Sequence, residues 1–169
     1  MLQRSRILAN RSFAELSNTP AVQTLLRRLE NGEVSSLSSL PVVGQTLVTA
    51  LIQLAFPSHA VVLVTDNRRT QEICEQDVRT WLTLLSPAES ESPTRYYPAS
   101  ALLPHDSTLP HADVISDRLE TLLALPTGTG AGRPILTNLT ALLQTTFPPE
   151  SLSARVRTVH RGDRIDPLD

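Results

Sequence analysis

Segments typical of strands and segments typical of helices alternate along this chain, which limits its possible folds more than any other feature. The clearest strand candidate is AVVLVTD at residues 60–66, a short apolar run rich in β-branched residues that is typical of a strand covered on both faces. The helical pattern that follows extends to about Leu85, and Asp66 or Asn67 is placed to cap its start. Two more strand-like runs are RYYPAS at 95–100, whose proline indicates an edge strand, and RPILTN at 133–138. The alternation predicts a layered α/β domain with a mainly parallel sheet.

Prolines, glycines and capping residues mark four more expected helices. They lie at residues 20–32, 46–56, 115–125 and 139–147. The first has Thr19 as N-cap and Gly32 as its stop, and the other three end at prolines. Residues 33–45, EVSSLSSLPVVGQ, begin with a strand-like pattern that breaks at Pro41. We therefore expect a strand, a loop and a helix in succession there.

The composition is that of an ordinary soluble globular protein. The chain has 169 residues, of which 40% are apolar and 19% charged, with a net charge of −2. The N-terminus lacks a signal-peptide pattern, and no apolar run approaches the roughly 20 residues that span a bilayer. We expect a cytoplasmic protein that does not contact membranes. The lone Cys74 agrees with this, since one cysteine builds neither an internal disulfide nor a thiolate metal cluster.

All 15 basic residues are arginine, and the chain contains no lysine. Several kinds of catalysis depend on a lysine, including a phosphate-loop lysine, a Schiff-base lysine and a Ser-Lys dyad. The composition excludes all three within this chain.

Residues 39–46, SLPVVGQT, match the phosphate-loop template G-x-x-x-x-G-K-[ST] only in part. Gly44 and Thr46 fit, whereas Ser39 stands for the first glycine and Gln45 for the lysine. The template works because backbone N–H groups surround the phosphates, the lysine reaches the β and γ oxygens and the hydroxyl binds magnesium. Pro41 removes one N–H donor as well. The partial match by itself favours an ordinary strand-to-helix connection, and the position of the segment between an expected strand and an expected helix also allows a degenerate nucleotide loop. In either case we expect no bound cofactor.

Two other patterns have a functional and a structural interpretation. AVVLVTD resembles a Walker B strand, but no acidic pair follows it, and we favour the interpretation that Asp66 or Asn67 caps the next helix. His105, Asp106, His111 and Asp113 lie within nine residues and offer nitrogen and oxygen ligands for a metal. The alternative is that this loop forms turns and that His111 or Asp113 opens the next helix.

The last stretch, ARVRTVHRGDRI, alternates like a strand with one solvated face. Four arginines give it a basic character that suits either phosphate contacts or a solvated edge. They are Arg155, Arg157, Arg161 and Arg164. The Arg161-Gly162-Asp163 tripeptide predicts a turn.

The run LPHDSTLPHADVISDRLETLLAL, followed by RPILTNLTALLQ, resembles the N-terminal UvrB-like region of bacterial transcription-repair coupling factor (Mfd). In that family a Leu-Pro-x-Asp-like loop with a second proline leads into an Asp-x-x-Ser-x-Arg-Leu helix. The matching residues are Leu103, Pro104, Asp106, Pro110, Asp113, Ser116, Arg118 and Leu119. The degenerate loop at 39–46 and the apolar strand at 60–66 also lie where the family has them.

This resemblance implies a RecA-like (P-loop NTPase-like) domain at residues 1–148 and the opening strand of a following module at 149–169. It implies a non-catalytic docking platform in transcription-coupled nucleotide excision repair. The excision-repair protein UvrA would be the partner of the longer protein, which contains the other domains and an ATP-dependent DNA translocase motor. DNA and RNA polymerase would be contacted only through that full-length protein. The UvrA contacts of the family lie mainly in the module after this one, so no contact residue is carried over.

Two further functions remain open. One is a small metal-dependent hydrolase that uses His105, Asp106, His111 and Asp113. The other is a stand-alone adaptor of RecA-like fold with an unrelated partner. An open reading frame that continues far beyond Asp169 would favour the coupling-factor interpretation over the adaptor.

Overall fold

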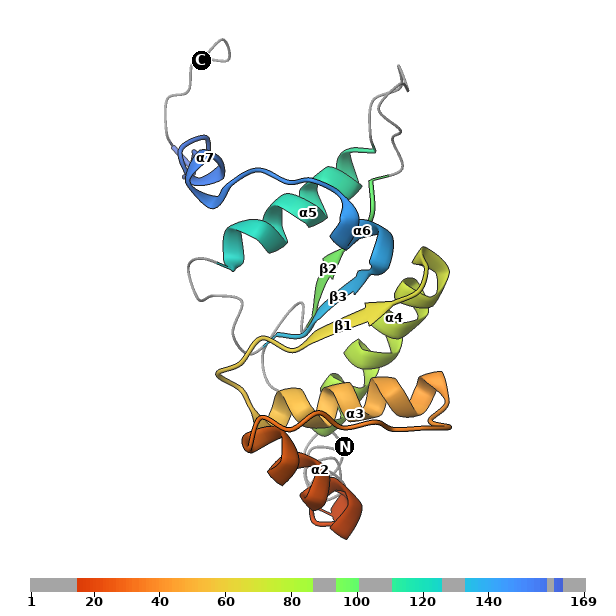
Figure 1. The fold of residues 1–169 in the computed structure, drawn as a ribbon. Coiled ribbons are helices and arrows are strands. Elements are labelled where there is room, and N and C mark those ends of the chain that lie inside the picture. The colour runs from red at the N-terminus through yellow and green to blue at the C-terminus, as the bar shows by residue number, and fades with distance from the viewer. Residues whose placement is uncertain (1–14, 87–93, 101–110, 126–132, 158–159, 163–169) are drawn as a thin grey trace, which may run out of the picture.

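The computed structural model describes residues 15–86, 94–100, 111–125, 133–157 and 160–162, and Figure 1 shows their arrangement. Three parallel strands form one sheet in the order β1-β3-β2. β1 (Val62–Thr65) and β2 (Arg95–Tyr97) flank the central β3 (Ile135–Asn138). Val62 and Arg95 both align with Ile135, so the strands end at the same edge of the sheet. The predicted α/β class, its parallel pairing and the edge position of RYYPAS are confirmed.

Helices lie on both faces of this sheet (Figure 1). On one face α4 (Arg68–Leu85) contacts β1 and β3, and α3 (Val42–Ala55) packs beside α4. On the other face lie α5 (Ala112–Ala124), which contacts β2, and the short α6 (Leu139–Leu143), which follows β3 directly. Two further helices lie at the periphery: α2 (Pro20–Glu30) before α3, and α7 (Pro149–Ser153), which packs on α5. None of the helices in the described ranges is long and apolar enough to cross a membrane.

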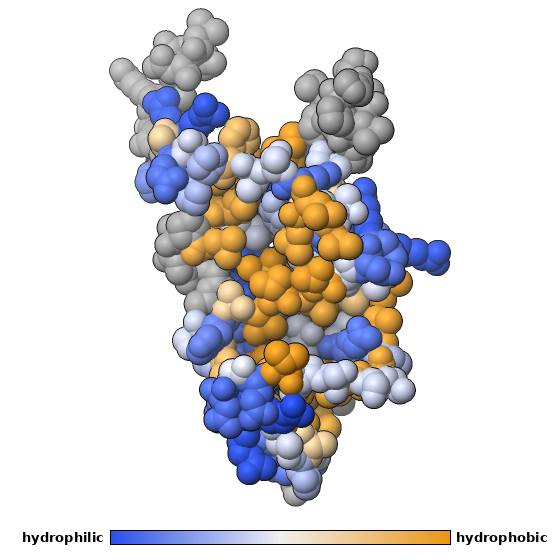
Figure 2. Space-filling view, viewed as in Figure 1, coloured by the Kyte–Doolittle hydropathy of each residue, from blue (hydrophilic) through white to orange (hydrophobic). Residues whose placement is uncertain are grey.

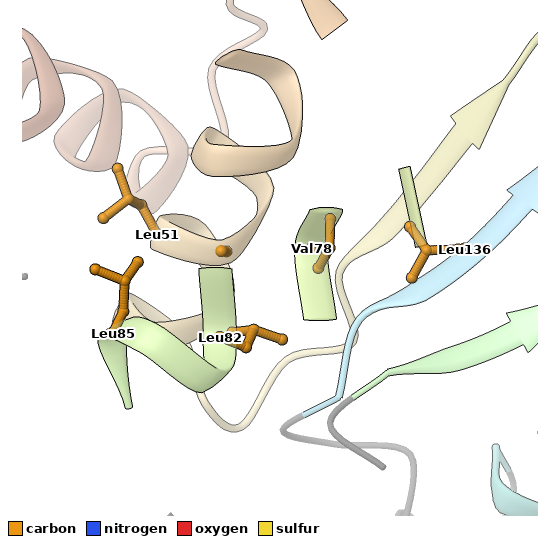
Figure 3. Packing of buried hydrophobic residues seen from close by; sticks show 6 residues of the cluster. Leu51, Val78, Leu82, Leu85 and Leu136 are labelled. Atoms are coloured by element: carbon orange, nitrogen blue, oxygen red, sulfur yellow. The ribbon is translucent and has the colours of Figure 1, made fainter. Parts of the chain in front are cut away.

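The main core lies between the sheet, α3 and α4 (Figure 3). Leu136 of β3 is fully buried and faces Val78 and Leu82 of α4, while Leu51 of α3 meets Leu85 at the far end of α4. A second, smaller cluster on the opposite face joins the two sheet residues Tyr97 and Ile135 to Ala141 of α6. Because successive strand side chains point to opposite faces, β3 supplies apolar residues to both clusters.

The strand expected at the start of residues 33–45 does not form. Gly32 ends α2 in the left-handed region at φ 72°, and the chain then runs in extended form alongside α3 without joining the sheet (Figure 1). Arg28 donates to the Glu33 carboxylate and to the Val34 carbonyl, both at 3.0 Å. These bonds hold the segment against α2 and occupy a carbonyl that a strand would use for pairing.

Two other predictions about strands are wrong. The run at 60–66 is not covered on both faces, because β1 lies at the edge of the sheet and the side chains of Val62 and Val64 are about half exposed. The basic stretch after α7 is not a strand in its described parts, 154–157 and 160–162. There the chain turns, and Gly162 adopts φ 105°.

Candidate functional site

The segment SLPVVGQT forms the entry to α3, which begins at Val42. Ser39 adopts φ 65°, so the chain turns sharply just before the helix. Gly44 lies in the first helical turn beneath Leu40, where a Cβ atom would stand 2.8 Å from Leu40 Cδ1. Packing therefore explains why a glycine occupies position 44, since only a residue without a side chain lets Leu40 lie over the helix start.

The polar groups of this segment are bonded within it. Gln45 Nε2 donates to the Leu40 carbonyl at 3.0 Å, and the backbone N–H groups of Gly44 and Gln45 donate to the Pro41 carbonyl. Thr46 is fully buried, and its hydroxyl donates to the Val43 carbonyl at 2.9 Å. The groups that would bind phosphate and magnesium in an intact loop therefore stabilise the helix start instead.

A buried polar network lies where the parallel strands end, which is the edge at which open α/β sheets bind ligands. Its centre is Gln71 of α4, which has no exposed surface. Gln71 Nε2 donates to the carbonyls of Tyr97 at 3.1 Å and of Leu136 at 2.9 Å, and Gln71 Oε1 accepts from Asn138 Nδ2. Asn138 Oδ1 accepts from the Ala141 N–H at 2.9 Å and so caps α6. The network thus ties β2, β3, α4 and α6 together.

Arg118 of α5 extends this polar cluster over the end of β2. Its Nη1 donates to the Pro98 carbonyl at 2.7 Å and to Gln144 Oε1 at 3.2 Å, and its guanidinium lies 4.4 Å from the centre of the Tyr97 ring. Gln144 also bonds both backbone groups of Ser100 at 2.8 Å. This pairing explains why α6 ends at Leu143 rather than continuing through the predicted 139–147.

The sequence analysis singled out Arg118 only as part of the family resemblance and missed the other three polar residues, Gln71, Asn138 and Gln144. A signal was present for Gln71, because it lies on the same helical face as Cys74 and Val78, where a polar residue is unusual. Buried polar side chains in proteins are nearly always hydrogen-bonded. The position therefore indicated an internal network, although its partners lie far away in the chain.

The end of β1 confirms the capping prediction for Asn67. Its side chain accepts from the Thr70 N–H at 2.9 Å at the start of α4. Asp66 is exposed, and a hydrogen bond from the Thr70 side chain lowers the pKa of its carboxyl group. Both the acidic and the amide side chain thus bond to groups at the start of α4.

The structure describes two of the four candidate metal ligands, His111 and Asp113. His105 and Asp106 lie outside the described residues. His111 occupies the N-cap position of α5 and Asp113 its first turn, and both are exposed, which confirms that this pair opens the helix. Across the described ranges, no group of three or more His, Cys, Asp and Glu residues is placed to hold a metal ion.

The structure describes three of the four arginines after α7. Arg155 lies 5.7 Å from the centre of the Phe147 ring, and Arg157 and Arg161 are exposed. Arg164 lies outside the described residues. The three described arginines thus do not lie on a strand.

A small charged pocket lies between α4, β2 and α5. Arg95 is buried, with its Nη1 3.4 Å from Glu120, and Thr94 donates to Glu75 at 2.8 Å. Burial raises the pKa of the Asp117 carboxyl group, and the nearby Glu120 charge raises it further. The acids here serve mainly as partners for Arg95, Thr94 and Arg79.

Two apolar features remain. A cavity of about 280 Å³ lies over the sheet between α5 and α6, lined mainly by apolar side chains that include Val62, Leu122 and Leu142. Cys74 is buried, which raises the pKa of its thiol and keeps it in the unreactive protonated form. Neither feature supplies a nucleophile.

No protein-family model, curated protein or solved structure matches the chain.

Proposed function

We propose that this chain is a non-catalytic docking module of RecA-like type that works within a transcription-repair coupling factor. One observation carries the proposal. The edge of the sheet where an α/β domain binds nucleotide is filled by side chains that bond to one another, centred on Gln71 and Asn138. The helix entry at Gly44 is likewise closed by Leu40. A layered α/β domain whose helix entry at 39–46 has its polar groups bonded within the segment is suited to a structural role.

Two of the residues shared with the coupling-factor family, Arg118 and Leu119, have structural roles that agree with this proposal. Arg118 stacks on Tyr97 and bonds to the end of β2, and Leu119 lines the apolar hollow under α7. The run that carries the resemblance therefore holds α5 in place against the sheet. In the longer protein, this module would support the UvrA-recruiting end while the DNA translocase motor lies elsewhere.

Calorimetry with ATP and magnesium tests the non-catalytic part. We expect no binding, and we expect the Gln45→Lys variant to remain inactive, because Leu40 still covers Gly44 and Thr46 still donates to Val43. A dissociation constant in the low micromolar range, or measurable hydrolysis, would refute the degenerate-site interpretation.

A pull-down against UvrA tests the docking part. Purified chain and a longer version that includes the following module are immobilised separately, because the family's UvrA contacts lie mainly in that module. We expect the longer version to retain UvrA and this chain alone to retain much less. Failure of both to retain UvrA would refute the assignment to transcription-coupled repair.

A further inference from the structure

The outer edge of β1 has hydrogen-bonding groups that point away from the sheet. The Ile135 N–H donates to the Val61 carbonyl at 2.8 Å, so this carbonyl and the backbone groups of residues 63 and 65 point towards β3. The N–H and C=O groups of Val62 and Val64 then point to the other side. No strand of the described part of the chain pairs with that side.

An apolar surface adjoins this edge. Because side chains alternate along a strand, Leu63 faces the main core while Val62 and Val64 share the open face. The neighbouring α6 adds Leu142, which lines the same cavity as Val62, and it also carries Leu143, which is 78% exposed. Figure 2 shows this apolar surface over β1 and α6. We name it the β1–α6 patch, and its members are Val62, Val64, Leu139, Leu142 and Leu143.

We infer that a second copy of this chain covers the patch, with the two β1 strands pairing antiparallel across a two-fold axis. With the two-fold axis at Leu63, Val62 of each copy lies opposite Val64 of the other copy. Each such pair exchanges both backbone hydrogen bonds, so four bonds form from groups that all point outward. The two small sheets would join into one continuous sheet.

The residue types along the outer edge of β1 are compatible with pairing to the same edge of a second copy. β1 has no charged residue, so two copies meet without like charges opposite one another. The edge also lacks the lysine, proline or bulge that monomeric proteins use to prevent such pairing.

The area also fits a dimer. The exposed fractions of the five side chains correspond to roughly 500 Å², at the upper end for a single apolar surface on a monomer. Two copies would thus bury about 1,000 Å², near the lower limit for a specific interface. This predicts a weak, concentration-dependent dimer, which would form whether or not the chain binds UvrA.

Sedimentation velocity over a wide range of protein concentrations tests this inference. We expect the wild type to shift from monomer to dimer as concentration rises. Val64→Pro removes an outward N–H that β3 does not use, and Leu143→Glu places a charge on α6 without altering the strand. Both variants should dimerise at least about tenfold more weakly. The control is Val34→Glu, which changes a residue that is 92% exposed outside the patch and should dimerise like the wild type.

Hydrogen exchange supplies a second measurement that does not depend on variants. The amides of Val62 and Val64 should gain protection as concentration rises, while that of Val34 should not. A wild type that stays monomeric at every concentration would overturn the inference. So would a folded Leu143→Glu variant that dimerises as strongly as the wild type, or equal exchange at Val62 and Val64 in dilute and concentrated samples.

Discussion

Replacing Gln71 by leucine tests whether the buried network at the end of the strands stabilises the domain. The substitution keeps most of the side-chain volume and removes the amide. Asn138 Nδ2 then loses the acceptor that it bonds in the wild type. The Tyr97 carbonyl keeps the Thr137 hydroxyl as a donor at 2.9 Å, so the principal loss is at Asn138.

The expected cost follows from these contacts. A buried amide donor left without a partner costs about 1–3 kcal/mol, and the lost hydrogen bonds to strand carbonyls add about 1 kcal/mol. Burial of the more apolar leucine offsets about 1–2 kcal/mol of this. We therefore expect the free energy of unfolding to fall by about 2 kcal/mol, a large share of the total for a domain of this size.

Urea denaturation followed by circular dichroism measures the change. The matched control is Gln76→Leu, on the exposed face of the same helix, which should change stability by less than about 0.5 kcal/mol. A double-mutant cycle of Gln71→Leu with Asn138→Ala separates the effect of the network from that of the α6 cap. The double variant should lose at least about 1 kcal/mol less free energy of unfolding than the sum of the losses in the two single variants. Equal urea midpoints for the Gln71→Leu and Gln76→Leu variants would refute the reasoning.

Three further predictions concern other parts of the fold. Leu136→Ala, in the main core, should destabilise by about 2–5 kcal/mol in the same urea assay, and a cost below about 1 kcal/mol would contradict the packing in Figure 3. Gly44→Ala should raise the free energy of unfolding by about 1 kcal/mol in a Leu40→Ala background, because alanine has the higher helix propensity. In the wild type the gain should be smaller, because the Leu40 side chain must move away from the new Cβ atom. Equal gains in both backgrounds would refute the close contact between Gly44 and Leu40. Because the folded pKa of Asp66 lies below its ordinary value of 3.8, its contribution to stability is complete above that value and is lost as pH falls through the folded pKa. Thr70→Val should make the acid-induced fall in urea midpoint smaller, and an unchanged pH profile would contradict the Thr70 hydrogen bond as its cause.

The sequence predicted the elements that depend on short-range chemistry. The bounds of α2 and α4 follow from Thr19, Gly32 and Asn67, and β-branched apolar runs marked β1 and β3. Caps, proline stops and side-chain periodicity act over a few residues, so they can be interpreted without knowing the rest of the fold. The same reasoning failed at residues 33–36, because a strand requires a partner as well as a suitable pattern.

Only the tertiary structure decided which of these elements meet. Gln71 and Asn138 are 67 positions apart, and nothing local to either one indicates the other. A run such as AVVLVTD also has the same hydropathy in the middle of a sheet as at its edge, so the exposure of Val62 and Val64 became evident only from the strand order. The sequence by itself determined the layered α/β class and the lysine-free helix entry at 39–46. The closed polar network and the open edge of β1 arise from contacts between distant segments, which local propensity does not encode.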